Sequence, residues 1–417
     1  MATSSPSNET IPNVVCTGCA LLCDDIFVEM EDGSFKQGVN ACNRGWKKFQ
    51  YYLNELVPLN CQQRPGKQGG DVVTYDDALA GAVSILQEAK SPLVYGFASS
   101  SLEDQQAIFE LAEKVGAQLG GPAFQTLIPF YTQAINALLY TGTLAEAINK
   151  ADVFVFWNAD PLESHPRLLS KVIYSRGFFR ITGYEVKKYI VIHPSDPDKF
   201  RGTTLGVKVP PEIEQELINA LRASIVAGAP ADAPAGVDKA AFEKLASLLI
   251  DAEYAIFFLD KSTLRSDSSS PLLTDLAGLV ADLNQKERAM LLPLAEDLNS
   301  MGLFLHSLAT GRFPLAEVDW EHVDAIMVGG VEETTELPPQ LLSAGKSVPL
   351  IFLPQEEMIL AKSADIIIPV AAPGITDGGT AARFDGVAVP LKKVAEPKNA
   401  APTTLQVITD IIARLSA

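Results

Sequence analysis

The 417-residue sequence has few of the side chains that usually carry metal and acid–base chemistry, with five cysteines and four histidines. No cysteine occurs after Cys61, and no histidine directly follows a cysteine. No G-x-S-x-G segment is present, which excludes a serine nucleophile elbow. No apolar, strand-like stretch is followed by G-x-G-x-x-G, which excludes the dinucleotide fingerprint of NAD enzymes.

Positive charge and long hydrophobic runs are also scarce. The 33 basic residues face 51 acidic ones, and the net charge of −18 argues against a nucleic-acid partner. No run of about twenty uncharged apolar residues occurs, so no membrane span is expected. The first residues lack the basic start and apolar core of a signal peptide, and we expect a cytoplasmic protein. The basic residues that could attract an anionic ligand gather in one stretch: Arg176, Arg180, Lys187, Lys188, Lys199 and Arg201.

Four of the five cysteines cluster near the N-terminus with the spacing C-x2-C-x3-C-x18-C, namely Cys16, Cys19, Cys23 and Cys42. Three thiolates in one tight loop and a fourth returning from a short hairpin can converge on one centre. The spacing suits an iron–sulfur cubane and, less well, tetrahedral zinc. Cys61 is interpreted as a spare thiol.

After this segment, apolar strand-like stretches alternate with helix-like ones, such as Tyr75–Lys90, Leu102–Val115 and Thr403–Leu415. Such alternation predicts doubly wound α/β domains with parallel sheets. A hairpin is expected around the Glu31-Asp32-Gly33 turn and another in the FDGVAVPL segment. The seven predicted strands are Leu93–Phe97, Val153–Trp157, Tyr189–Ile192, Ala255–Leu259, Ala325–Val328, Val348–Leu353 and Asp365–Val370.

Several phrases of the sequence carry a family resemblance. The cysteine spacing followed by Cys42-Asn43-Arg44-Gly45 resembles the cluster domain that opens molybdenum- and tungsten-pterin oxidoreductases. Within that superfamily, the B subunit of formylmethanofuran dehydrogenase is similar in four places: CTGCALLCDDI, NADPLESHPRLLSK with RGFF, SADIIIPVAAPGI, and GGTAARFDGVAVPLKKV. These phrases extend over nearly the whole chain.

The resemblance implies a fold and a set of ligand residues. It implies an α/β protein with a small N-terminal Cys-rich metal domain, residues 1–66, and two doubly wound parallel-sheet domains, residues 67–140 with 331–417 and residues 141–330. The four cysteines would hold a 4Fe–4S cluster, with zinc or no metal as alternatives, and Arg44 would lie between cluster and pterin. The residues it places near pterin guanine dinucleotides are Ser99, Ser100, Asn158, Asp160, His165, Arg167, His193, Asp196 and Arg201.

One departure from the family changes the functional expectation. In formylmethanofuran dehydrogenases a cysteine or selenocysteine holds the metal and is followed directly by a histidine. Here the corresponding stretch is apolar and includes Leu127, Ile128, Pro129 and Phe130, so only Ser99–Ser101 or Thr126 are left as alternative ligands. We therefore expect redox catalysis to be lost and molybdopterin guanine dinucleotide to be absent.

Without redox catalysis, this chain resembles the B subunit of the formyltransferase/hydrolase complex of one-carbon metabolism. The expected partners are a hydrolytic, amidohydrolase-like subunit and a formyl-methanofuran-like carrier. Relatives that act alone add a C-terminal β-barrel, so a separate β-rich capping subunit is also expected. The alternatives are an intact tungsten or molybdenum dehydrogenase subunit and a purely structural scaffold.

Overall fold

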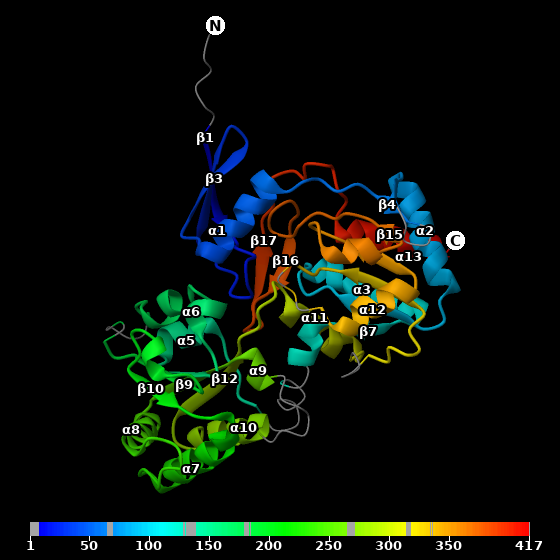
Figure 1. Ribbon diagram of the computed structural model, residues 1–417. Helices are drawn as coiled ribbons and strands as arrows, with labels where there is room; N and C mark the ends of the chain where they lie inside the picture. Colours follow the sequence, from blue (N-terminus) through cyan, green and yellow to red (C-terminus); the bar gives the residue numbers. More distant parts are fainter. Residues whose placement is uncertain are drawn as a thin grey trace. The chain divides into compact units, whose positions relative to one another are not determined.

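The computed structural model describes residues 8–64, 70–127, 130, 139–178, 183, 185–264, 272–313, 318–333, 335 and 337–416. The chain divides into two compact units (Figure 1). Unit 1 comprises Met1–Gln125, Asp297–Arg383 and Ala388–Ala417, and unit 2 comprises Thr126–Glu296 and Phe384–Val387.

The N-terminal segment of unit 1 is a three-stranded antiparallel sheet, β1 (Asn8–Val14), β2 (Ile26–Glu31) and β3 (Ser34–Val39). This confirms the predicted hairpin. Helix α1 (Asn43–Gln50) follows and continues into one π-helical turn, η1 (Tyr51–Glu55). Val15 and Leu22 share a small apolar core with residues from the C-terminal part of unit 1: Leu298, Ala381, Val389 and Leu391. The predicted small N-terminal domain is not confirmed as a separate unit, because this segment groups with unit 1 and shares this core with it.

The main sheet of unit 1 has seven strands in the order β5-β4-β15-β14-β13-β6-β7. All pairs from β15 to β7 for which a register is defined are parallel, whereas β4 and β5 add an antiparallel edge. The central strands are buried and lack charged residues, as expected for a sheet covered on both faces. The strands are β4 (Gln62–Gln63), β5 (Asp71–Val72), β6 (Pro92–Gly96), β7 (Gln118–Gly120), β13 (Ala325–Gly329), β14 (Leu350–Leu353) and β15 (Ile366–Ile367).

Helices α2 (Tyr75–Glu88) and α3 (Leu102–Val115) of unit 1 begin at side-chain caps. Thr74 accepts the N–H of Asp77 at the start of α2, and Ser101 with Asp104 forms a capping box on α3. The hairpin of β16 (Gly379–Ala382) and β17 (Ala388–Leu391) confirms the second predicted hairpin. The helices are α2 (Tyr75–Glu88), α3 (Leu102–Val115), α11 (Ser300–Thr310), α12 (Pro339–Ser347) and α13 (Thr404–Ser416), with a 3-10 turn η6 (Ile359–Ser363).

Unit 2 is built on a five-stranded parallel sheet in the order β10-β9-β8-β11-β12. Its strands are β8 (Val153–Trp157), β9 (Lys188–His193), β10 (Leu205–Lys208), β11 (Tyr254–Leu259) and β12 (Arg288–Pro293). Its helical elements are α5 (Leu144–Lys150), α6 (Pro161–Ser164), η3 (Leu169–Ile173), η4 (Pro197–Lys199), η5 (Pro211–Ile213), α7 (Glu214–Ala227), α8 (Lys239–Ile250), α9 (Lys261–Leu264) and α10 (Leu272–Leu283).

The predicted strands and their parallel arrangement are confirmed, but one domain boundary is not. All seven predicted strands are present, and β15 is shorter than expected. β13 pairs with β6 and β14 in unit 1, so residues 297–330 do not belong with residues 141–296 as predicted. The reason is long-range: a strand joins whichever sheet offers it hydrogen-bonding neighbours, and those neighbours lie far away in sequence.

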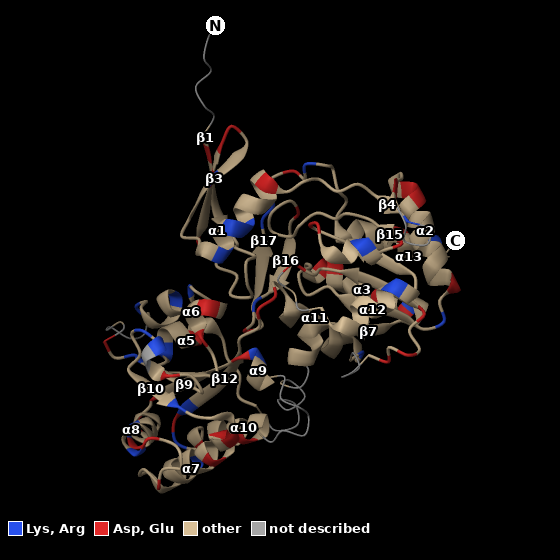
Figure 2. Cartoon of the chain, in the orientation of Figure 1, with Lys and Arg blue, Asp and Glu red and all other residues tan. Residues whose placement is uncertain are grey.

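Charged side chains lie mainly on helices and loops, whereas β6, β8, β11, β13 and β14 carry none (Figure 2). Among the described residues, no helix combines the length and apolar character that a membrane crossing requires.

Candidate metal loop and strand-end loops

Three of the clustered cysteines, Cys16, Cys19 and Cys23, lie between β1 and β2, and Cys42 directly precedes α1. The N–H of Cys16 donates to the carbonyl of Cys23 at 2.8 Å, which closes the loop. The first three side chains are buried and Cys42 is half-buried. A Cβ atom at Gly45 would lie 2.4 Å from Cys16 Sγ, so the start of α1 needs glycine to pack against the loop.

The thiols of this loop influence one another electrostatically. Burial raises the pKa of Cys16 and of Cys19 to about 12, and charge on neighbouring thiols contributes to the rise. For Cys16 these neighbours are Cys19 and Cys42, and for Cys19 they are Cys23 and Cys42, while Arg44 lowers the pKa of Cys19. Both thiols therefore stay protonated at neutral pH unless a bound cation stabilises the thiolates.

The loop is not arranged around a single ion. Among the described residues, no three His, Cys, Asp or Glu side chains are placed so that they could hold one. A zinc site needs its sulfurs about 2.3 Å from one ion, whereas a 4Fe–4S cluster is a larger body held by four cysteines. The assignment of the four cysteines as ligands stays a prediction.

In unit 1, the predicted ligand residues Ser99 and Ser100 follow β6 and are buried. The N–H of Ser99 donates to the carbonyl of Gly330, and its own carbonyl accepts from Gln355 Nε2, both at 2.9 Å. The Ser100 carbonyl accepts from Asn299 Nδ2 at 2.9 Å, while its buried hydroxyl has no partner among the described residues. Of these backbone groups, only the Ser99 N–H could donate to a phosphate, and it is already in use.

Two buried amide side chains close this strand end. Gln105 Nε2 donates to the carbonyls of Phe97 and Asn299, both at 2.9 Å. Asn299 Nδ2 also donates to Gln105 Oε1 at 3.2 Å, and Asn299 Oδ1 accepts from the N–H of Ala382 at 2.7 Å. This network joins the end of β6, α3, α11 and β16, and it engages the amide donors that a ligand would need.

The N-terminus of α3 already holds a carboxylate. Asp104 accepts the N–H of Ser101 at 2.8 Å and the N–H of Leu405 at 2.8 Å, which ties the start of α13 to α3. Burial raises the pKa of Asp104 to about 6. A phosphate that approached this helix end would meet an acidic group where it needs free N–H groups.

Sequence reasoning missed a charged cluster between the cysteine loop and the same sheet. Lys48 Nζ donates to the carbonyl of Thr17 at 2.9 Å and to Glu332 Oε1 at 2.7 Å. Glu356 Oε1 accepts the N–H of Glu333 at 2.8 Å, and burial raises the pKa of Glu356. These glutamates follow β13 and β14, so their positions after apolar strands were the signal that could have revealed them.

In unit 2, Asn158 and Asp160 follow β8 as predicted, but both serve the local structure. Asn158 Nδ2 donates to Glu214 Oε1 at 2.9 Å and to Thr263 Oγ1 at 3.2 Å. Asp160 Oδ1 accepts the N–H of Leu162 at 2.9 Å and so caps α6. The Asn158 amide at the end of β8 is therefore hydrogen-bonded to residues of α7 and α9.

The two histidines assigned to the dinucleotide site are constrained by the protein itself. His165 is fully buried, and its Nε2 lies 2.9 Å from the carbonyl oxygen of Ala295. His193 Nδ1 accepts the N–H of Ser195 at 2.9 Å, and its ring packs edge-on against Phe200. Burial lowers the pKa of His193, so it is neutral at pH 7.

One residue of the predicted basic cluster does not lie on the surface. Lys187 is buried, and its ammonium group donates to the carbonyls of Ile148, Val172 and Ser175, so it is not available to a surface anion. Arg180 lies outside the described residues. Arg167 and Lys188 are half-buried, and the exposed residues among the predicted site and basic-cluster members are Arg176, Asp196, Lys199 and Arg201.

The stretch at which the resemblance places a metal-ligating pair is apolar and partly described. Leu127 and Phe130 are buried, and Phe130 belongs to the core of unit 2. Thr126, named as an alternative ligand, is also buried. Ile128 and Pro129 lie outside the described residues.

Two solved structures share this fold over most of the chain. One is a chain of the formyltransferase/hydrolase complex FhcABCD from Methylorubrum extorquens in complex with methylofuran, with a TM-score of 0.67 and 20% identity over 85% of this chain and 98% of that one. The other is acetylene hydratase from Pelobacter acetylenicus, with a TM-score of 0.69 and 12% identity over 97% of this chain and 69% of that one. These likenesses show that this chain shares its α/β fold with both proteins.

Sequence similarity narrows the class. No family model matches the chain. Two curated proteins, each named as the B subunit of tungsten-containing formylmethanofuran dehydrogenase 2, are 27% identical over 93% of this chain and 94% of their own length. They come from Methanococcus maripaludis and Methanocaldococcus jannaschii. The predicted resemblance to the B subunit of formylmethanofuran dehydrogenase is thereby confirmed over nearly the whole chain.

Proposed function

We propose that this chain is the B subunit of a formyltransferase/hydrolase-type complex that processes formyl groups on a methanofuran-like carrier, and that it carries out no redox reaction itself. The observation that carries this proposal is the loss of the family's metal ligand pair. No cysteine follows Cys61, and Leu127 and Phe130 are buried where the pair is expected. An apolar site is also a costly place for the charge of a substrate carboxylate.

The strand-end loops supply a second line of support. A pterin dinucleotide would need free donors beyond β6 and β8, but the N–H of Ser99 and the side-chain amide of Asn158 donate to other residues of the chain, whereas the buried Ser100 hydroxyl has no partner among the described residues. Breaking these contacts would leave buried polar groups unsatisfied, at about 1–3 kcal/mol for each group. The residues present therefore do not fit the guanine dinucleotide that the fold family implies.

Unlike the strand-end loops, the cysteine loop is proposed to bind a cofactor. Cys16, Cys19, Cys23 and Cys42 would hold a 4Fe–4S cluster, with zinc as the alternative. Such a cluster can transfer electrons when a redox partner is present. In a chain without pterin chemistry it would instead link the loop between β1 and β2 to α1, because the apolar core that this segment shares with the rest of unit 1 is small.

The proposed partners are a hydrolytic, amidohydrolase-like subunit, a β-rich capping subunit and the formyl carrier. The first support is that the similar FhcABCD chain belongs to a complex that was solved with methylofuran. The second is the presence of exposed basic side chains, among them Arg176, Lys199 and Arg201, which could steer an anionic carrier. A chain that light scattering shows to be a stable monomer with no tendency to associate would count against an obligate complex.

The deciding experiment uses the purified complex in two assays. We expect formate release from the formyl carrier and no formate-dependent reduction of a viologen dye. A variant complex with Leu127→Ala tests whether this chain contributes to either activity, since the substitution opens the apolar stretch without adding a ligand. Dye reduction that depends on this chain would overturn the proposal.

The second candidate is a redox-active tungsten or molybdenum dehydrogenase subunit. It is favoured by the names of the two curated relatives and by the complete cysteine set. Elemental analysis of anaerobically purified complex separates the candidates. Tungsten or molybdenum together with iron would support the dehydrogenase, iron or zinc alone the non-redox subunit, and no metal a purely structural role.

A further inference from the structure

A groove of about 420 Å³ lies in unit 1, at the amino-terminal ends of the sheet strands and away from the loops described above. We call it the α2 groove. One wall is a single face of α2 and its end, formed by Gly81, Ser84, Ile85, Glu88 and Ala89. The other wall consists of Gln63, Arg64, Asp324, Pro349, Asp365 and Ile366.

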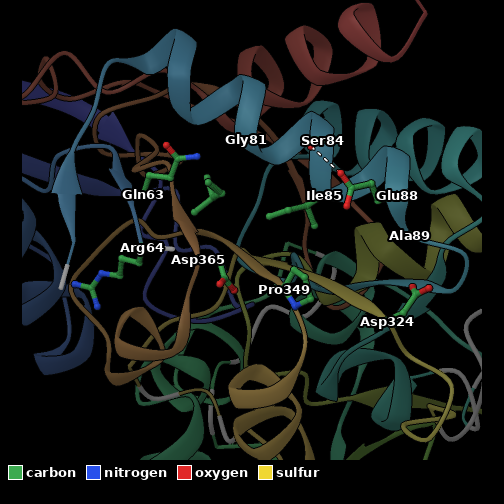
Figure 3. A pocket seen from close by; sticks show the side chains of 11 residues that line it. Gln63, Arg64, Gly81, Ser84, Ile85, Glu88, Ala89, Asp324, Pro349 and Asp365 are labelled. Atoms are coloured by element: carbon green, nitrogen blue, oxygen red, sulfur yellow. Dashed lines mark hydrogen bonds between the residues drawn. The ribbon is translucent and has the colours of Figure 1, made fainter. Parts of the chain in front are cut away.

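The groove is elongated. Its sheet-side residues lie in or directly beside β4, β15, β14 and β13, which are consecutive neighbours in the sheet. At about 4.8 Å between adjacent strands, Arg64 and Asp324 lie at opposite ends, about 14 Å apart. The α2 residues from Gly81 to Ala89 span a similar length, about 12 Å at the rise of an α-helix. Figure 3 shows Arg64 at one end and Glu88 with Asp324 at the other.

The end formed by Glu88 and Asp324 is acidic. Asp324 accepts the N–H groups of Lys90 and Ser91, and Glu88 accepts the hydroxyl of Ser84. Within the described part of the chain, no ion pair involves either carboxylate. Nor do three carboxylates there form a group that could hold a metal ion. The charge at this end is therefore suited to an organic cation.

The middle of the groove is mostly apolar, and its one carboxylate, that of Asp365, accepts the N–H of Leu350 at 2.8 Å. Ile85, Ile366 and Pro349 lie between the charged ends, and Gly81 leaves room because a Cβ there would meet Ile366 Cδ1 at 2.6 Å. The rim is open to solvent, since Ser84, Glu88 and Pro349 are exposed. Small metabolites are usually bound in sites that bury most of their surface, so an open groove of this length is better matched by an extended peptide, at about 3.3 Å per residue.

We propose that the α2 groove binds an extended segment of a partner protein, three to four residues long, that carries a lysine or arginine beside an aliphatic residue. The basic group lies between Glu88 and Asp324, and the aliphatic side chain packs on Ile85 and Ile366. The proposal goes beyond the function proposed above and does not depend on it, because the groove lies at the amino-terminal ends of the strands.

The test uses the full chain with isoleucine δ-methyl groups labelled for NMR. The probe is the blocked tetrapeptide Leu-Ala-Lys-Leu, and its matched control is Leu-Ala-Glu-Leu. We expect the lysine peptide to shift the methyl signals of Ile85 and Ile366 and to leave that of Ile256, buried in unit 2, unchanged. The glutamate peptide should produce no shift, and added salt should weaken the effect of the lysine peptide.

Two variants and two controls make the result specific. Glu88→Gln should weaken binding about two- to fivefold, as expected for an exposed charge pair, and Ser84→Trp should abolish it by filling the groove. Glu113→Gln, at an exposed position on α3, should change nothing. Equal shifts with both peptides, or no shift, would overturn the proposal. Spermidine shifting the same methyl signals while the lysine peptide does not would replace the peptide site with a small-cation site.

Discussion

The cysteine loop and the strand-end loops of unit 1 were both predicted to bind a cofactor, but they differ in how their polar groups are satisfied. The thiols of Cys16 and Cys19 are buried with raised pKa values, so nothing within the described part of the chain stabilises their charged forms fully. Beyond β6, by contrast, the side-chain amides of Gln105, Asn299 and Gln355 donate to the carbonyls of Phe97, Ser100 and Ser99, so these amide donors are not free for a ligand. Residue type therefore indicates where a ligand site could lie. Whether the polar groups there are free to bind a ligand depends on their hydrogen bonds to the rest of the chain.

The largest expected effect is the loss of metal from the cysteine loop. Cys19→Ser should remove essentially all metal from anaerobically purified protein, because a shared centre loses one of its ligands. Cys61→Ser is the control, since that thiol lies outside the loop. Metal content is measured by elemental analysis, and full retention of metal by Cys19→Ser would refute the shared centre.

The next effect tests whether the side-chain amide of Gln105 stabilises the end of β6. Gln105→Ala should lower the free energy of unfolding by about 3 kcal/mol or more, because it leaves the carbonyls of Phe97 and Asn299 without this donor in a buried site. The neighbouring Gln106→Ala removes only an exposed contact to Glu110 and should cost less than about 0.5 kcal/mol. Denaturant unfolding of the two variants measures the difference. Equal unfolding free energies of the two variants would show that the hydrogen-bond network of Gln105 does not stabilise the fold.

Protonation of the carboxylate at the start of α3 should produce a smaller effect. Burial raises the pKa of Asp104 from its ordinary value of 3.8 to about 6, so the folded state binds the proton more tightly than the unfolded state. Stability from this group is fully present below about pH 4 and is lost as pH rises through about 6, a change of about 2–3 kcal/mol.

This linkage is measured by comparing wild type with Asp104→Asn. The unfolding free energy of wild type should fall relative to the variant across that pH window, while the difference stays constant above about pH 7. A difference that rises with pH would mean that the folded state prefers the charged carboxylate.

The smallest expected effect concerns the contact between the two regions. Lys48 joins the carbonyl of Thr17 in the cysteine loop to Glu332 beyond β13. Lys48→Met should lower the free energy of unfolding by about 1–2 kcal/mol, because the pair is mostly shielded from solvent. Lys47→Met, at the exposed neighbouring position, is the matched control. No difference between the two variants would show that the regions are not coupled through Lys48.

Much of the fold could be predicted from local patterns. Helix α3 has the predicted bounds, because Ser101 and Asp104 form a capping box at its start and Gly116 ends it in the left-handed conformation. The buried parallel strands were recognisable as continuous apolar runs. β10 and β12 were missed, because β10 mixes apolar residues with glycine and lysine and β12 begins at an arginine.

The candidate site was less predictable than the fold. Ser99, Ser100 and Asn158 occupy the predicted strand ends, but the side chains that engage them come from Gln355, Asn299 and Glu214. These partners lie between 56 and 256 positions away along the chain. Neither periodicity nor spacing encodes such pairings.

The sequence by itself determined which segments become helices and strands and where four thiols gather, because capping, apolar periodicity and short loop spacing act over a few neighbouring residues. Only the tertiary structure decided that β13 joins the sheet of unit 1, that Lys187 is buried among three carbonyls, and that the end of β6 is closed. The physical reason is that a buried polar group must find a partner wherever the folded chain places one.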